Sequence, residues 1–142
     1  MPVLDKIDQP DPKPEGQNLA VTVETLYVLN LLLLPFVAFA ILIYIFLTRH
    51  SNAPPMARSH MEQTISASIW IAVMFIAGAG CIMLLQLWGM EDVTVWILIV
   101  ITFTIVHASM VLLGVMGLAK AMAGKCWRYP VFGKALPPGC NQ

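Results

Sequence analysis

Residues 93–119, VTVWILIVITFTIVHASMVLLGVMGLA, are the stretch that decides the fold, because they contain no aspartate, glutamate, lysine or arginine. A helix needs about 20 mainly apolar residues to cross about 30 Å of hydrocarbon at about 1.5 Å per residue. Lipid offers the backbone no hydrogen-bond partners, so such a segment must satisfy its own N–H and C=O groups as a helix. The stretch therefore predicts a transmembrane helix.

Two further apolar runs precede it, at about residues 26–48 and 64–88. The composition agrees, since hydrophobic residues make up 58% of the chain and charged residues only 11%, against about a half and a quarter in soluble proteins. A short turn around residues 89–92 separates the second and third runs, which predicts an antiparallel hairpin. The predicted fold class is an all-α integral membrane protein with three transmembrane helices. Pro35 is expected to bend the first helix.

The rest of the chain is predicted to form two extended arms. Residues 1–25 are acidic and rich in proline, which disfavours both a helix and a central strand. Residues 26–122 make up the expected transmembrane domain, and residues 123–142 an interfacial tail. We expect the first arm to order only along a partner, because it has few apolar groups with which to offset its ordering entropy.

The distribution of lysine and arginine predicts the orientation, because basic residues in short loops stay in the cytoplasm. With three helices, the loop after the first and the tail after the third share one side. Six cations fall there: Arg49, Arg58, Lys120, Lys125, Arg128 and Lys134. The other side has Lys6 and Lys13 among a larger number of acids, and Glu91 and Asp92 in the short turn. We therefore predict a multi-pass protein of the bacterial inner membrane with its N-terminus outside and its C-terminus in the cytoplasm.

The tail begins with a short basic and aromatic segment, GKCWRYPVFGK, at residues 124–134. Its cations suit anionic headgroups, at about 1 kcal/mol each. Trp127 and Tyr129 combine an apolar body with a polar group, as side chains at the membrane interface do. Pro130 cannot continue a helix. The segment thus predicts an interfacial anchor that contacts anionic lipid.

The three cysteines show no metal-binding spacing. Cys81 lies in the second apolar run, and Cys126 and Cys140 lie in the tail. Because the tail is predicted to be cytoplasmic, we expect three free thiols. A bridge between Cys126 and Cys140 is expected only if the tail lies outside.

Helical periodicity brings small and polar residues to one face of the third run. Gly114 and Gly117 lie on that face with His107, and small residues let another helix approach closely. Gly78 and Gly80 form a similar patch on the second run, so these four glycines are predicted to mediate helix packing. His107 then points into the bundle and donates a hydrogen bond to a neighbouring helix. The alternative is that His107 ligates haem or a pigment, or serves a proton path.

The sequence shows no pattern typical of catalysis, metal binding or nucleic-acid binding. No nucleophile, base and orienting group stand together, so we predict no catalytic residues, no metal site and no enzyme activity. The nine methionines are scattered, which favours adaptable packing over copper binding. No basic helix or phosphate loop indicates nucleic acid or a soluble substrate. No cofactor is predicted beyond the haem or pigment alternative at His107.

Two segments carry a family resemblance: ARSHMEQTISASIW at 57–70 and GKCWRYPVFG at 124–133. They resemble a family of small bacterial integral membrane proteins, a domain of unknown function, that is distantly similar to the inner-envelope translocon subunit of plastid protein import. The matching positions are His60, Gln63, Trp127, Arg128, Tyr129 and Pro130. The resemblance implies a three-helix core whose helix ends are pinned at the cytoplasmic face, and it supplies no activity. We expect Arg128 or Tyr129 to contact the His60–Gln63 turn and form one interfacial cluster.

Three functions are compatible with these features. The first is a non-catalytic accessory or structural subunit of a larger membrane complex, packed against other integral membrane subunits through its helix faces and arms. The second is a small transporter or translocon-like channel, which would need an oligomer lined by Asn30, Gln86 and His107. The third is a haem- or pigment-binding subunit that uses His107. The first is the prediction, because no convergent polar site is evident.

Overall fold

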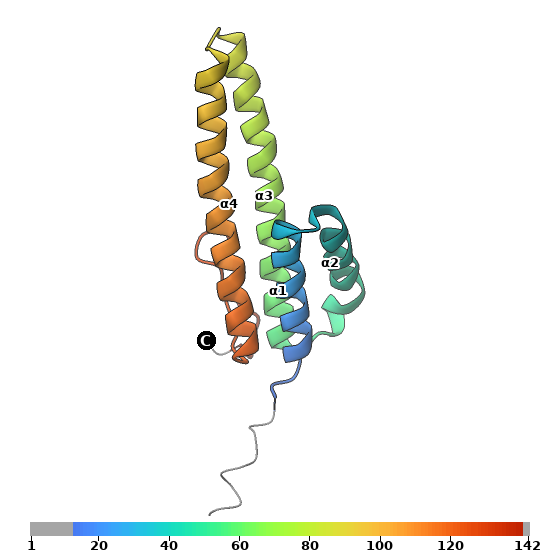
Figure 1. Ribbon diagram of the computed structural model, residues 1–142. Helices are drawn as coiled ribbons and strands as arrows, with labels where there is room; N and C mark the ends of the chain where they lie inside the picture. Colours follow the sequence, from blue (N-terminus) through green and yellow to red (C-terminus); the bar gives the residue numbers. More distant parts are fainter. Residues whose placement is uncertain (1–12, 141–142) are drawn as a thin grey trace, which may run out of the picture.

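The computed structural model describes residues 13–140, which form helices and irregular segments without a strand. Figure 1 shows the arrangement. The elements are α1 (Gln17–Leu32), α2 (Pro35–Arg49), the short 3-10 helix η2 (His50–Asn52), α3 (Pro55–Leu87) and α4 (Asp92–Met122). The predicted all-α membrane fold is confirmed, since three helices are long and apolar enough to cross a membrane: α2 with η2, α3 and α4.

The two longest helices, α3 and α4, form the predicted antiparallel hairpin (Figure 1). They have 33 and 31 residues, so each is about 45–50 Å long and exceeds the hydrocarbon core. Helix α3 starts at Pro55, nearer the N-terminus than the predicted residue 64, because proline is favoured in the first turn. Gly89 allows the sharp turn between them with its φ of 77°.

The first predicted span differs from the structure. The bend expected at Pro35 is a chain reversal, in which α1 ends at Leu32 and α2 turns back beside it (Figure 1). The N–H groups of Leu33 and Leu34 both donate to Leu29 O and close α1. Pro35 then begins α2 without needing a donor for its missing N–H. Helix α1 also begins at Gln17, so the predicted extended arm over residues 1–25 is wrong for 17–25.

This reversal places the start of α1 and the end of α4 at the same end of the bundle (Figure 1). Gln17 Nε2 donates to Met122 O at 2.7 Å and to Ala121 O at 3.3 Å. A Cβ on Gly124 would lie 2.8 Å from Pro14 Cγ. Residues 13–25 and the tail therefore lie at the same end of the bundle, whereas the prediction set the N-terminal arm and the tail on opposite sides of the membrane. The side of the membrane on which each lies stays a prediction. The remainder of that arm, residues 1–12, lies outside the described residues.

The core lies at this same end, which we call the tail end. Buried residues of α1 recur every three or four positions and define one face that packs on α3 and α4. They are Ala20, Val23, Glu24 and Tyr27. Towards the α3–α4 turn, by contrast, large apolar side chains are exposed, including Ile76 and Leu87 on α3 and Trp96 on α4. Such an apolar outer surface suits lipid.

Candidate functional site

A buried carboxylate lies at the centre of the tail end. The side chains of Glu24, His60 and Tyr129 are fully buried, and they come from α1, α3 and the tail. Glu24 Oε1 lies 2.7 Å from His60 Nδ1, and the Tyr129 hydroxyl donates to Glu24 Oε2 at 2.8 Å. Both carboxylate oxygens therefore have partners, as burial of a charged group requires. We call these three residues the buried triad.

The second nitrogen of His60 defines the proton arrangement of the triad. Nε2 lies 3.0 Å from Lys125 O, and a carbonyl can only accept, so Nε2 carries a proton. Nδ1 and Glu24 then hold one further proton between them. Either an imidazolium donates to a carboxylate or a carboxylic acid donates to a neutral ring.

Tyr129 can act only as a donor in this arrangement. Burial, and after it the charge of Glu24, raises the pKa of the Tyr129 hydroxyl far above its usual value. The hydroxyl therefore keeps its proton and holds the tail against α1 through Glu24. The ring of Tyr129 also packs beside Tyr27, with 6.0 Å between the ring centroids.

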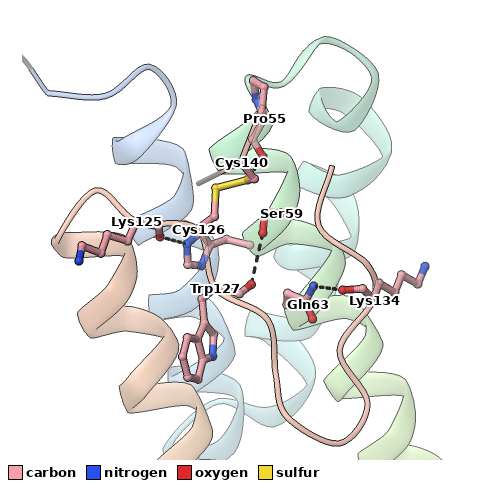
Figure 2. The surroundings of a disulfide bond; sticks show 9 residues. Pro55, Ser59, Gln63, Lys125, Cys126, Trp127, Lys134 and Cys140 are labelled. Carbon is pink, nitrogen blue, oxygen red and sulfur yellow. Dashed lines mark hydrogen bonds between the residues drawn. A yellow bond between two sulfur atoms is a disulfide. The ribbon is translucent and has the colours of Figure 1, made fainter. Parts of the chain in front are cut away.

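One polar face of α3 binds the backbone of the tail. The residues on this face are spaced by four and then three positions, so they align along the helix. The donors and their carbonyl acceptors are Ser59 to Trp127 at 3.3 Å, Gln63 to Lys134 at 2.9 Å and Ser66 to Phe132 at 2.9 Å. Figure 2 shows the first two bonds. An irregular segment can therefore be buried here without leaving these three carbonyls unpaired.

The tail turns tightly where it crosses Gln63. Gly133 N donates to Tyr129 O at 3.1 Å, and Tyr129 N donates to Gln63 Oε1 at 3.4 Å. A Cβ on Gly133 would lie 2.7 Å from that same amide oxygen, so only glycine fits. The expected contact between Tyr129 and the His60–Gln63 turn is thus present.

A disulfide closes the tail into a ring (Figure 2). Cys126 and Cys140 are bonded, with 5.7 Å between their Cα atoms. The prediction of three free thiols is wrong for this pair, and only Cys81, exposed on α3, is free among residues 13–140. The reason is a second turn, in which Cys140 N donates to Pro137 O at 3.2 Å and the chain returns to Cys126.

The sequence profile of the magnetosome magnetite crystal formation protein family matches residues 15–136. The chain belongs to this family. The match runs from the start of α1 to the part of the tail just beyond Lys134, so it includes the triad and the polar face of α3. Comparisons with curated proteins and with solved structures found no significant match. The predicted membership of a family of small membrane proteins is confirmed, and the likeness to the plastid translocon subunit stays a prediction.

In this member of the magnetosome family, two of the four predicted packing glycines lie in a helix contact. A Cβ on Gly114 would lie 2.8 Å from Tyr27 Cε1, and one on Gly117 would lie 2.5 Å from Glu24 Oε2. Their partner is α1, not α3. A Cβ on Gly78 or Gly80 would meet nothing within 4 Å, so neither mediates packing within residues 13–140.

His107 lies apart from the triad, in an apolar groove of about 430 Å³ between α3 and α4. Its ring stacks on Phe103, with 5.2 Å between centroids and 14° between planes. No hydrogen bond joins it to another of the described residues, so the expected bond to a neighbouring helix is not present there. The haem or pigment alternative stays untested.

The other predicted interfacial residues lie around the tail. Lys120 Nζ is 5.4 Å from the centroid of the Trp127 ring, and Arg128 Nε donates to Gly133 O at 3.3 Å. Pro130 is exposed in the turn of the tail. The structure thus brings His60, Gln63 and Tyr129 into one buried unit and leaves Arg128 and Pro130 at its surface.

Sequence reasoning missed Glu24, which was counted among the outer charges. The signal was available, because Glu24 is the single charged residue in the stretch NLAVTVETLYVLNLLLLPF at 18–36. An acid isolated in an apolar helix usually faces the protein interior and has a partner there.

Proposed function

We propose that this chain is a non-catalytic structural subunit of the magnetosome membrane, and that it acts in magnetite crystal formation through contacts with other integral membrane subunits. The observation that carries the proposal is the family match over residues 15–136, which includes the whole bundle and most of the tail. Membership of the family supports a part in magnetite crystal formation. The geometry of the buried triad supports a structural role.

The buried triad favours a structural role over catalysis. Glu24, His60 and Tyr129 are 0% exposed, and a substrate would have to displace the tail to reach them. Their hydrogen bonds join α1, α3 and the tail, three segments far apart in the sequence. Such a fully satisfied network stabilises one arrangement of the segments.

The outer surface supports membrane partners. Large apolar side chains of α3 and α4 are exposed towards the α3–α4 turn, among them Ile76, Leu87 and Trp96. We propose that lipid covers most of this surface and that other membrane subunits cover the open small-residue patch at Gly78 and Gly80.

Charge supports an orientation with the tail end in the cytoplasm. The lysines and arginines of residues 13–140 lie in segments at the tail end: Lys13, Arg49, Arg58, Lys120, Lys125, Arg128 and Lys134. The α3–α4 turn at the other end has Glu91 and Asp92 and no cation. By the positive-inside rule, we propose that the tail end lies in the cytoplasm, where its cations meet anionic headgroups.

The test is complementation in a magnetite-forming bacterium that lacks its own member of the family. Electron microscopy measures the size of the magnetite crystals in cells without the gene, with the natural gene and with the His107→Leu variant. We expect the natural chain to restore crystal size and His107→Leu to restore it equally. Unchanged crystals in cells without the gene would refute the proposed function. Loss of complementation by His107→Leu, with normal protein levels, would favour the cofactor or channel alternative.

A further inference from the structure

The disulfide and the charges of the tail end point to opposite compartments. The Cys126–Cys140 bond lies at the end that carries the cations, and the cytoplasm normally keeps thiols reduced. Cytoplasmic disulfides, where they occur, are mostly transient or redox-sensing. A disulfide at a cationic, cytoplasmic end of the protein is consistent with both observations if the bond forms and breaks as the redox state of the cytoplasm changes.

We propose that Cys126 and Cys140 form a reversible thiol–disulfide switch on the cytoplasmic face, which latches residues 135–140 against α3 when oxidised and releases them when reduced. This inference rests on the orientation given under the proposed function. It concerns a modification site distinct from the buried triad.

The surroundings of the two sulfurs suit both redox states. Cys126 is 6% exposed and packs with Ala20, Met56 and Ala121, where a neutral thiol is as acceptable as a disulfide. Cys140 is only partly buried, so a small thiol can reach its sulfur. That sulfur lies 3.5 Å from Pro55 O (Figure 2).

The hydrogen bonds from α3 to the tail determine how much of the tail reduction can release. Up to Lys134 the tail is bound by Ser59, Gln63 and Ser66 and by the triad, none of which needs the disulfide. Beyond Lys134 the chain is held by the disulfide, by the packing of Leu136 and by the approach of Cys140 Sγ to Pro55 O. Reduction should therefore free residues 135–140 and leave residues 125–134 in place.

Release would open a groove at the junction of three segments. This groove, of about 250 Å³, is lined by Pro14 and Glu15 before α1, by Pro54 and Pro55 at the start of α3, and by Cys126 and Gly139 of the tail. The redox state would thus control access to the two residues just before α1, Pro14 and Glu15.

The chemistry is thiol–disulfide exchange with a low-molecular-weight disulfide such as glutathione disulfide. The Cys140 thiolate attacks one sulfur of that disulfide, forms a mixed disulfide and expels one glutathione thiolate. The Cys126 thiolate then attacks the Cys140 sulfur and expels the second. Two cysteine thiols are oxidised, one glutathione disulfide is reduced to two glutathione molecules, and the two thiol protons end on those molecules.

The test uses the full chain with Cys81→Ser, in lipid nanodiscs equilibrated with glutathione buffers from strongly reducing to strongly oxidising. Maleimide trapping measures the fraction of bonded Cys126–Cys140. We expect a change from mostly reduced to mostly oxidised across the buffer series. We also expect exchange of the Cys140 amide, the one N–H of residues 135–140 with a backbone partner, to rise at least tenfold on reduction, with residues 125–134 unchanged. A bond that survives the most reducing buffer, or exchange that does not change, overturns the proposal.

Two controls test the redox switch and the orientation of the tail separately. A variant with Cys126→Ser and Cys140→Ser should show the faster exchange of the amide at position 140 in every buffer. In that variant, which also carries Cys81→Ser, Ala135→Cys supplies a single reporter for a membrane-impermeant maleimide applied to spheroplasts. Labelling only after permeabilisation supports the cytoplasmic orientation. Labelling without permeabilisation refutes the orientation and the switch, whereas an unresponsive bond with a cytoplasmic reporter refutes the switch alone.

Discussion

Glu24 of α1 and Gly117 of α4 are in such close contact that a Cβ at position 117 would lie 2.5 Å from Glu24 Oε2. The missing side chain on α4 makes the space in which the carboxylate is buried. From that position Glu24 reaches both His60 and Tyr129. The glycine and the acid therefore form one structural unit, although they belong to helices far apart in the sequence.

The first prediction follows from this contact. Gly117→Ala should lower the free energy of unfolding by about 1–3 kcal/mol, because the added methyl group meets a buried carboxylate that cannot move freely. Thermal unfolding in detergent, followed by circular dichroism, measures the change.

Gly80→Ala is the matched control, because a Cβ there meets nothing within 4 Å. It should be neutral or raise stability by up to about 1 kcal/mol through the higher helix propensity of alanine. Equal destabilisation by the two variants would contradict the assigned α1–α4 contact.

The second prediction concerns the loss of the carboxylate. Glu24→Ala leaves His60 Nδ1 and the Tyr129 hydroxyl without partners, so it should cost about 3–5 kcal/mol of stability, as the breaking of buried pairs does. Glu24→Gln should cost less, since its amide still fills the site and offers an acceptor. The exposed Glu15→Gln is the control, with an expected change within about 0.5 kcal/mol. If Glu24→Ala unfolds no more easily than Glu15→Gln, the triad does not stabilise the fold.

The third prediction isolates the hydroxyl of Tyr129. Tyr129→Phe keeps the ring and removes one hydrogen bond to a charged or proton-sharing carboxyl, which should cost about 1.5–3 kcal/mol. Tyr44→Phe is a matched control, because the Tyr44 side chain is 67% exposed. A double-mutant cycle with Glu24→Gln should give non-additive changes. Additive changes would mean that the two residues do not interact in solution.

The helical membrane fold could be predicted because hydrophobic length is itself the physical requirement for crossing a bilayer. The reversal before Pro35 could not, since a proline in an apolar run is compatible with both a kink and a new helix. The choice depends on tertiary contacts, such as those of Glu24 and Tyr27 with α4, which no local pattern encodes.

The candidate site was predictable only in part. The hairpin of α3 and α4 was sufficient to bring Tyr129 to Gln63, because both lie near helix ends on one side of that hairpin. Glu24 was missed because residues 1–25 were assigned to an extended arm, whereas Glu24 lies in α1, where its isolation among apolar residues indicates a buried acid. The bond between Cys126 and Cys140 was missed because thiols in the cytoplasm are normally reduced. The turn that brings the two sulfurs together cannot be seen in the spacing of the cysteines.

The last prediction tests how α3 holds the tail. Gln63→Leu removes the donor to Lys134 O and the acceptor for Tyr129 N, so both backbone groups lose their partner beneath the tail. Amide exchange in residues 129–134 should rise at least tenfold, which corresponds to about 1.4 kcal/mol of lost protection. Arg128→Ala is the control, because Arg128 is exposed and bonds only to Gly133 O within residues 13–140. If both variants raise exchange to the same extent, the tail is held by its own turn and not by the polar face of α3.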